Sequence, residues 1–435
     1  MACKGRVISP FHGIRYRTAE SRDLSSRMAP PYDIIDASLQ DDLYAQDEHN
    51  FVRVELPRPP EQETEENNRY TQAAATLESW LARGVMIRDE RPAFYALEQE
   101  FTIHGERWRR RGVFAALRLP EEGERHVLSH EGTMAGPKAD RLKLMQACAT
   151  MTSPIMVMSE DSESKLLSRL QQIRREPDAT AVDHERVTHR LWAIDGDEDV
   201  DAIRSAVGVG PLYIADGHHR FETAITCRDG MREAYPSAPA DAGFNYALAL
   251  VTSARDEALK ILPTHRLISG LGARGIESMK RRMSEWCDVK QVAAADCQAS
   301  RIEGLLGSAS GGRHTFLSRA SDGMCSLLTM RNEKLRPRAS VVASLGVSVL
   351  HEYLIDPVLV EMGGAAKLSF VHDERMAIQT VERGECDFAF FLRPASVHDV
   401  LRAAGAGERM PQKSTFFFPK APAGLVVSSL GPEPV

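Results

Sequence analysis

A short apolar run that leads straight into four polar residues and a glycine limits most strongly what this chain can fold into. Residues Pro211–Ala215 are apolar and predict a buried strand, and Asp216–Arg220, with the sequence Asp-Gly-His-His-Arg, follow without a break. The pattern then continues as a predicted helix from Phe221 to about Cys227. Polar groups at the end of a buried strand are costly unless they are paired or used. We therefore predict a strand–turn–helix unit whose turn is a functional site.

The Asp-Gly-His-His-Arg run has the residue types of an anion site. The first N–H groups of a helix are unpaired and attract anions, each favourable charge there contributing about 0.3–1 kcal/mol. Gly217 allows a phosphate to approach the backbone, Arg220 offers donors that suit phosphate oxygens, and His218 and His219 can donate or move protons. Asp216 could hold a metal, orient a histidine or accept a proton. Alternatively, Asp216 caps the helix and the histidines only pack.

The rest of the chain predicts an α/β (α+β) protein of two or three domains, because 435 residues exceed one simple core. We divide it into an N-terminal α+β segment (1–125), a core of alternating helices and strands (126–270) and a C-terminal α/β segment (271–435). Further predicted elements are a strand over 51–56, helices over 70–83, 139–149 and 340–354, a hairpin of 93–103 with 108–119, and a tail strand over 416–418.

Composition and charge exclude several classes of protein. A formal net charge of −7 argues against a general nucleic-acid or membrane-surface binder. No stretch of about 20 apolar residues and no apolar leader occurs, so we expect no membrane segment. The seven cysteines are odd in number and form no Cys-x-x-Cys pair, which argues against a disulfide framework and predicts a cytoplasmic location.

Two further clusters could contribute to the same chemistry. His130 and Glu131 precede Arg141 at a predicted helix start, and could supply a carboxylate base and phosphate contacts; a solvated loop is the alternative. In the tail, Lys413–Thr415 and Lys420 flank a predicted strand. A basic, hydroxyl-bearing strand can close over an anionic ligand, or its lysines can simply protect a sheet edge from aggregation.

Five segments, taken in chain order, resemble one family. They are Ala29–Asp33, Asn50–Val54, His130–Thr133 with Asp140–Arg141, Tyr213–Ala224, and Met410–Lys420. Together they are similar to the domain of unknown function 1015 family over almost the whole chain, and that family name conveys no activity.

The Asp-Gly-His-His-Arg run also resembles the phosphate-binding motif of the ParB/sulfiredoxin superfamily, in which the helix after the motif glycine cradles nucleotide phosphates. Sulfiredoxins need a motif cysteine, where this chain has His218 or His219. ParB proteins add DNA-binding helices and basic character. The resemblance is therefore closest to the free serine kinases, and implies a ParB/sulfiredoxin-like mixed-sheet core. The extra N-terminal and C-terminal parts depart from those kinases and leave the acceptor open.

This resemblance implies a kinase that moves a phosphoryl group from ATP or ADP, with Mg²⁺, to a hydroxyl of a small metabolite such as free serine. Glu131 falls near the catalytic carboxylate of the free serine kinases. The implied catalytic residues are His130, Glu131, Asp216 and His219, the nucleotide-binding residues are Arg141, Gly217, His218, Arg220, Lys413, Ser414 and Thr415, and the metal ligand is Asp216. A ParB-like nucleotide switch or NTPase without an acceptor, and a phosphoester hydrolase or lyase, stay open as alternatives.

Overall fold

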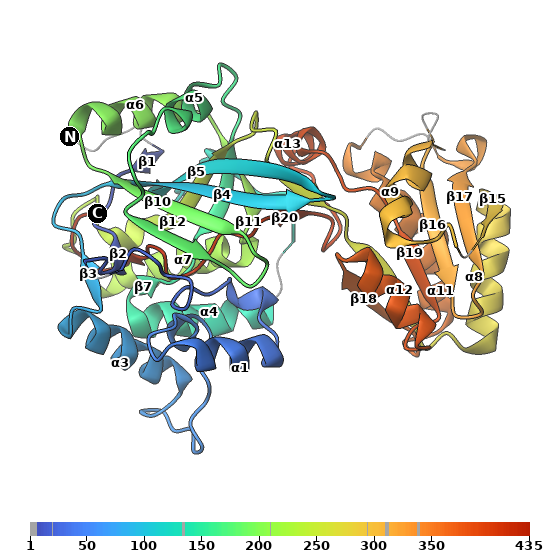
Figure 1. The fold of residues 1–435 in the computed structure, drawn as a ribbon, viewed down its shortest axis with the longest axis horizontal. Coiled ribbons are helices and arrows are strands. Elements are labelled where there is room, and N and C mark those ends of the chain that lie inside the picture. The colour runs from blue at the N-terminus through green and yellow to red at the C-terminus, as the bar shows by residue number, and fades with distance from the viewer. Residues whose placement is uncertain are drawn as a thin grey trace. The chain divides into compact units, whose positions relative to one another are not determined.

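The chain folds as two compact units (Figure 1). The computed structural model describes residues 7–19, 21–132, 135–208, 210–293, 295–308, 313–336 and 340–435. Unit 1 comprises Met1–Ser129, Thr133–Lys260 and Pro419–Val435, and unit 2 comprises His130–Gly132 and Ile261–Phe418. The C-terminal tail therefore belongs to unit 1, although the residues directly before it, Ile261–Phe418, belong to unit 2.

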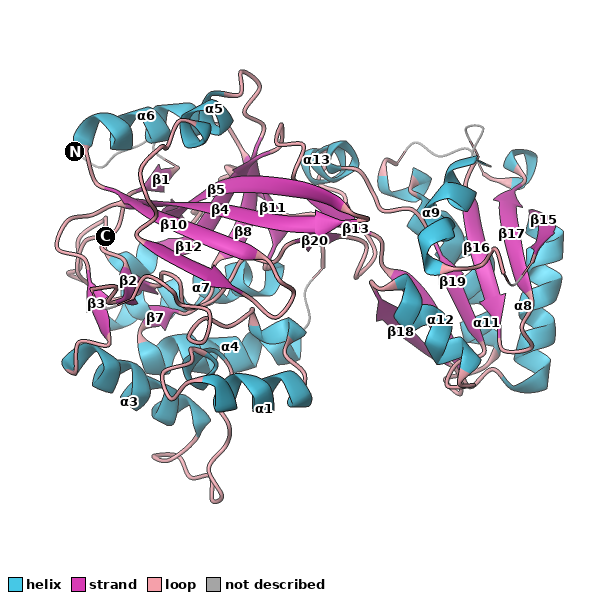
Figure 2. Ribbon diagram, viewed as in Figure 1, coloured by secondary structure: helices cyan, strands magenta, loops and turns pink. Residues whose placement is uncertain are grey.

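A mixed sheet of nine strands forms the centre of unit 1 (Figure 2). In spatial order its strands are β6 (Val127–Leu128), β11 (Leu212–Asp216), β8 (Ile155–Ser159), β12 (Tyr246–Ser253), β5 (Glu106–Arg118), β4 (Phe94–Ile103), β10 (Thr188–Ile194) and β9 (Ala179–Val182), and β1 (Ile8–Ser9) pairs with β5. Two neighbouring pairs, β11 with β6 and β12 with β8, are parallel, and the others are antiparallel. The predicted mixed α/β class is confirmed.

The β4–β5 hairpin is the longest local element of this sheet and confirms the hairpin predicted from the sequence. Its turn residues His104 and Gly105 both have positive φ, 52° and 85°. Two successive positive φ angles are the requirement of a tight hairpin turn whose twist matches that of the strands. Strand β12 beside it is buried along almost its whole length, as a central strand with both faces covered should be.

Helices cover the sheet of unit 1 on both faces. They are α1 (Ala37–Gln46), α2 (Val52–Glu55), α3 (Arg69–Ala82), α4 (Ala135–Cys148), α5 (Lys165–Gln171), α6 (Asp197–Val207) and α7 (His218–Ala234). Helices α5 and α6 lie on one side, and α1, α3 and α4 on the other (Figure 2). Helix α4 packs on α7 and α3 packs on α4. Short strand pairs, β2 (Ile14–Tyr16) with β3 (Met86–Arg88) and β7 (Thr150–Met151) with β21 (Ser428–Ser429), complete the unit.

The strand predicted over Phe51–Leu56 is wrong, because this segment forms helix α2. Its alternation of apolar and polar residues is too short to decide between a strand and one helical turn. The hydrogen bonds of the Asn50 side chain favour the helical turn instead. Its Oδ1 accepts from the Val52 N–H at 3.0 Å, while its Nδ2 donates to the carbonyl oxygens of Ser26 and Met28 at 2.7 and 3.2 Å. This side chain starts the turn and ties it to a distant loop.

Unit 2 is built on a six-stranded antiparallel sheet. In spatial order its strands are β15 (Cys287–Val292), β17 (Cys325–Met330), β16 (Thr315–Ala320), β19 (Phe388–Phe391), β14 (His265–Ser269) and β18 (Lys367–Val371). The remaining elements are β13 (Lys260–Leu262), β20 (Phe416–Phe418), α8 (Gly272–Trp286), α9 (Ala299–Ser308), α10 (Gly346–Leu350), α11 (Asp356–Glu361), α12 (Glu374–Glu382) and α13 (Val397–Gly405). Helices α9 and α12 pack together on one face of the sheet.

The helix predicted over Ser340–Leu354 is interrupted. A 3₁₀ turn at Val342–Ser344 comes first, then α10, and then a π-helical turn at His351–Ile355 that leads into α11. A π turn inserts one residue into the helical repeat and redirects the side chains around it. His351 therefore lies in a wider turn than a continuous α-helix would give.

The segments predicted as 1–125 and 126–270 share the sheet of unit 1, since β4 and β5 come from the first and β8, β11 and β12 from the second. The division into three domains stays a prediction. Six described cysteines are free thiols, and Cys3 lies outside the described residues. No described helix combines the length and the apolar run needed to cross a bilayer. The cytoplasmic location stays a prediction.

A buried carboxylate ties α2 to the rest of unit 1. Glu55 is fully buried, and its oxygens accept from the Tyr32 N–H at 3.2 Å, the Ser153 hydroxyl at 2.8 Å and the Thr152 hydroxyl at 2.6 Å. The Arg141 guanidinium lies 3.8 Å from the same carboxylate and donates to the Glu55 carbonyl at 2.8 Å. This arrangement joins four separate segments of the chain.

Replacing Glu55 with alanine is expected to lower the free energy of unfolding by about 3–5 kcal/mol, because two hydroxyls and the Tyr32 N–H lose their acceptor and the buried Arg141 loses a counter-charge. Urea unfolding measures the change. The matched control is Glu48→Ala, since the Glu48 side chain is 79% exposed and its loss should cost less than about 0.5 kcal/mol. Equal effects of the two substitutions would contradict the role assigned to Glu55.

Candidate active site

The strand–turn–helix unit predicted from the sequence is present in unit 1. Strand β11 ends at Asp216, Gly217 is the residue before the helix, and α7 begins at His218. The pairing of β11 with β8 shifts register between Ile214 and Asp216. Such a bulge re-aims the side chains that follow it, so Asp216 leaves the strand in a direction that a regular ladder would not allow.

Only glycine fits at position 217. Its φ is 89° and its ψ 29°, which is the left-handed region that side chains disfavour. A Cβ built there would lie 3.0 Å from Cγ2 of Ile155 and 3.2 Å from the guanidinium of Arg220. Because glycine has no side chain, no cap of its own covers the first N–H groups of α7. The N-terminal end of α7 is therefore suited to an anion.

The carboxylate of Asp216 is clamped between two cations. One oxygen accepts from Nη2 of Arg220 at 2.7 Å, and the other accepts from Nζ of Lys420. Burial alone would raise the pKa of this carboxyl, but the charges of Lys420, Arg220 and His218 outweigh burial and hold the pKa well below its ordinary range. Asp216 is therefore ionised at neutral pH. Its carboxylate and the two cations Arg220 and Lys420 together carry one net positive charge.

Lys420 is held in place by its own backbone. The Lys420 carbonyl accepts from Nε2 of Gln99 at 3.0 Å, and the preceding Pro419 carbonyl accepts from the guanidinium of Arg110. Arg110 is buried on β5, and burial lowers its pKa to about 10. Side chains of β4 and β5 thus bind the backbone of Pro419 and Lys420. This places the side chain of Lys420 beside the Asp216 carboxylate.

Arg220 and Arg141 are both buried and use their guanidinium groups inside the protein. Arg220 donates to the Pro154 carbonyl as well as to Asp216. Arg141 donates to Asp140 at 2.6 and 2.8 Å and lies 4.2 Å from the centre of the Tyr32 ring. Burial raises the pKa of Tyr32 to about 12, and the charges of Arg220 and Arg141 act in the opposite direction. The phosphate-binding roles of the two arginines stay predictions.

The two histidines of the run differ in exposure. His218 is buried and His219 is half-buried, and the His219 carbonyl accepts from the Thr223 hydroxyl at 2.7 Å. Adjacent residues at the start of a helix point in different directions, so they have different neighbours. His219 is the more accessible candidate for proton transfer, and its catalytic role stays a prediction.

A second group of predicted residues comes together in unit 2. Oε1 of Glu131 accepts from the Lys413 N–H at 3.2 Å, and the Met410 N–H donates to the His130 carbonyl at 2.7 Å. Nε2 of His130 lies 3.2 Å from the Thr415 hydroxyl. Lys413 has a positive φ of 56°, unusual for a residue with a side chain. The tail turn is therefore shaped to hold the His130–Glu131 pair.

The structure thus collects the predicted residues into two groups: Gly217, His218, His219 and Arg220 with Asp216 in unit 1, and His130, Glu131, Lys413, Ser414 and Thr415 in unit 2. Sequence reasoning missed the buried partners Glu55, Gln99 and Arg110. It also did not pair Lys420 with Asp216, although Pro419 and Lys420 belong to the quoted family segments. No local spacing could have revealed that pair.

The residues around Asp216 do not fit a resident metal ion, because both carboxylate oxygens already bind cationic side chains. Within the described ranges, no group of three or more His, Cys, Asp or Glu side chains is arranged to hold a metal. A divalent ion would have to displace Lys420 or Arg220 to reach this carboxylate. The role of Asp216 as a metal ligand stays a prediction.

Comparison with known proteins gives a family and a set of distant structures. The model of the family described as "Protein of unknown function (DUF1015)" matches residues 8–348. No curated protein matches the chain.

Three solved structures illustrate the structural likeness. A conserved hypothetical protein from Pyrococcus furiosus is 14% identical, covers 70% of this chain and 91% of its own, and has a TM-score of 0.36. A free serine kinase in complex with AMP is 14% identical, with coverage of 67% and 83% and a TM-score of 0.34. SbnI with a C-terminal truncation, from Staphylococcus aureus, is 8% identical, with coverage of 71% and 84% and a TM-score of 0.33.

Replacing Asp216 with asparagine is expected to lower the free energy of unfolding at pH 7 by about 3 kcal/mol, because two buried cations lose their counter-charge. The folded pKa is depressed, so the carboxylate's contribution is fully present above the unfolded pKa of about 3.9 and is lost as the pH falls toward the folded value. Denaturant unfolding at pH 7 and below pH 4 should show the difference between native chain and variant shrinking in acid. Asp42→Asn, which removes an exposed carboxylate of α1, is the control, and a difference for Asp216→Asn that stays constant with pH would refute the clamp.

Proposed function

This chain belongs to the DUF1015 family, and we propose that it is a small-molecule kinase that transfers a phosphoryl group from ATP or ADP to a hydroxyl group. The observation that carries the proposal is the start of α7 directly after Gly217, an N-cap residue without a side chain, beside a clamp with one net positive charge. Backbone N–H groups and fixed cations are what a nucleotide phosphate needs. The likeness of this run to the phosphate motif of the free serine kinases supports the same assignment, and with it a ParB/sulfiredoxin-like core.

In this proposal the phosphate chain of the nucleotide lies at the start of α7, bound by the N–H groups that follow Gly217. Asp216 does not bind phosphate itself, since its carboxylate is taken by Arg220 and Lys420. It fixes those cations so that their charge faces the anion without reorganisation during the reaction. Catalysis of phosphoryl transfer depends mainly on such positioning and charge stabilisation. Mg²⁺ would neutralise phosphate charge as the counter-ion of the nucleotide.

Glu131 is proposed as the base that accepts the hydroxyl proton of the acceptor. The Lys413 N–H donates to one of its oxygens and so orients the carboxylate. His130, held against Thr415, and the half-buried His219 are proposed to assist proton movement. Serine or a related hydroxy amino acid is the proposed acceptor, on the resemblance of the motif alone. Lys413, Ser414 and Thr415 are proposed to contribute donors from the tail.

The phosphate site can be tested with two glycines of the same helix. Gly217→Ala places a Cβ at a positive φ and against Ile155, so we expect nucleotide binding measured by calorimetry to weaken about tenfold or more. Gly230→Ala is the control, because Gly230 is exposed on α7 with open space around it and should gain stability without losing affinity. Unchanged nucleotide affinity in Gly217→Ala would place the phosphates elsewhere.

The reaction can be tested by incubating the chain with ATP or ADP, Mg²⁺ and a panel of hydroxy amino acids, and measuring phosphorylated product. Glu131→Gln should lower the turnover number by about 10²–10⁴-fold and leave nucleotide affinity nearly unchanged, as expected for loss of a general base. Hydrolysis of the nucleotide without any acceptor would favour an NTPase switch. Phosphate release from a phosphoester without nucleotide would favour a hydrolase or lyase.

A further inference from the structure

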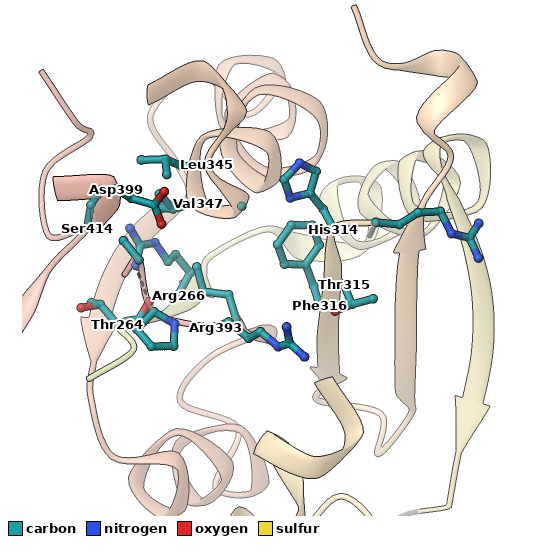
Figure 3. A pocket seen from close by; sticks show the side chains of 15 residues that line it. Thr264, Arg266, His314, Thr315, Phe316, Leu345, Val347, Arg393, Asp399 and Ser414 are labelled. Atoms are coloured by element: carbon teal, nitrogen blue, oxygen red, sulfur yellow. Dashed lines mark hydrogen bonds between the residues drawn. The ribbon is translucent and has the colours of Figure 1, made fainter. Parts of the chain in front are cut away.

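Unit 2 contains a pocket with basic side chains that the proposed reaction does not use (Figure 3). Its polar lining includes Thr264, Arg266, His314, Arg393 and Ser414. The cavity volume is about 160 Å³. At roughly 30 Å³ for each water molecule, this is room for about five waters, or for one small oxyanion group with part of its hydration.

Arg266 is the buried charge of this pocket. It lies on β14 and is completely buried. Its guanidinium donates to the carbonyl of Thr264, to the carbonyl of Lys413 at 3.3 Å and to Nε2 of His351 at 3.2 Å. Its carbon Cζ lies 5.1 Å from the centre of the Phe370 ring. Every one of these partners is neutral if His351 is neutral.

The hydrogen bonds of His351 show which of its ring nitrogens carries a proton. Arg266 can only donate, so Nε2 of His351 is the acceptor and carries no proton. The other ring nitrogen, Nδ1, lies 2.9 Å from Oδ1 of Asp356 and holds the single proton. The imidazole is therefore neutral. No described carboxylate forms an ion pair with Arg266, and burial lowers its pKa to about 10.

A buried arginine without a counter-ion is unusual within the same sheet. Arg319, on the neighbouring strand β16, is also buried, but it pairs with Glu382 at 2.6 Å. Burying a charge without a partner costs several kcal/mol, and the usual compensation is an anion. Asp399 also lines the pocket, but its Oδ2 accepts from the N–H and hydroxyl of Ser396 in the capping box of α13.

We propose that this pocket binds a small oxyanion, the phosphate or carboxylate group of a metabolite, which supplies the missing counter-charge of Arg266. Figure 3 shows the side chains of Arg266, Arg393 and His314 around the hollow. Arg313 also lines the pocket, but it pairs with Asp288 at 2.9 Å. Planar guanidinium groups bind phosphate and carboxylate oxygens in a fork. The inference stands independently of the proposed kinase activity.

The pocket is also linked to Glu131 through one residue. The Lys413 carbonyl accepts from Arg266, and the Lys413 N–H donates to Glu131. An anion that draws the guanidinium of Arg266 therefore acts on the peptide groups that position Glu131. This consequence, an effect of the anion on turnover, rests on the proposed function, whereas binding of the anion does not.

The test is a titration of the full chain with inorganic phosphate and, separately, with acetate, followed by amide nitrogen–proton resonances. We expect the amides of Gly346 and Val347, which line the pocket, to shift with one of the two anions. Arg266→Gln should weaken that binding about tenfold or more. Arg319→Gln is the matched control, since it removes a buried arginine of the same sheet and should leave the binding intact.

Because Arg266→Gln could disturb folding, Arg393→Gln, on the exposed side of the pocket, is the second variant and should also weaken binding. Asp399→Asn should strengthen it, since an acid beside the anion is removed. The pocket resonances report this site separately from the amide of Gly217, so a failed kinase assay leaves the result unaffected. No shift of Gly346 and Val347 with either anion, or an anion affinity in the Arg266 and Arg393 variants equal to that of the native chain, would overturn the proposal.

Discussion

The arrangement of the candidate site depends on the ion pairs that Asp216 makes with Arg220 and Lys420. These residues come from the end of β11, from the first turn of α7 and from the C-terminal tail, and the lysine is 204 positions from the aspartate. Removing such charges from water is expensive, and the cost is recovered only when all members are present and well hydrogen-bonded. Loss of Asp216 leaves two buried cations without their counter-charge. The clamp therefore fixes the turn and the tail together.

This constraint also shows what the arginine of the motif does inside the protein. The buried Arg220 donates to Asp216 and to the Pro154 carbonyl, and its phosphate-binding role stays a prediction. In the proposed site, the N–H groups after Gly217 and the net positive charge of the clamp bind the anion. A preorganised site of this kind needs little rearrangement when the ligand arrives. Unit 2 shows the opposite case, because its buried Arg266 has no acidic partner among the described residues.

Local patterns predicted the elements that local interactions determine. The strand–turn–helix at Asp216–Arg220, the β4–β5 hairpin and helix α3 could be read from apolar spacing and turn residues. The segment around Val52 could not, since the Asn50 side chain starts helix α2 through bonds to a loop more than twenty residues away. The continuous helix predicted over 340–354 was wrong for a related reason, because a π turn has no spacing signal of its own. For the site, the sequence predicted which residue types gather after β11, but not that Lys420 neutralises Asp216 or that Glu55 is a buried hub.

The most direct test of the central claim is hydrogen–deuterium exchange of the peptide that covers the start of α7, with and without ADP. If the N–H groups after Gly217 hold the nucleotide phosphates, their exchange slows when ADP is added, and pyrophosphate alone gives much of the same protection. The Gly217→Ala variant should lose this protection while the Gly230→Ala variant keeps it. Unchanged exchange at this peptide, under conditions where calorimetry shows ADP bound to the chain, would contradict the account.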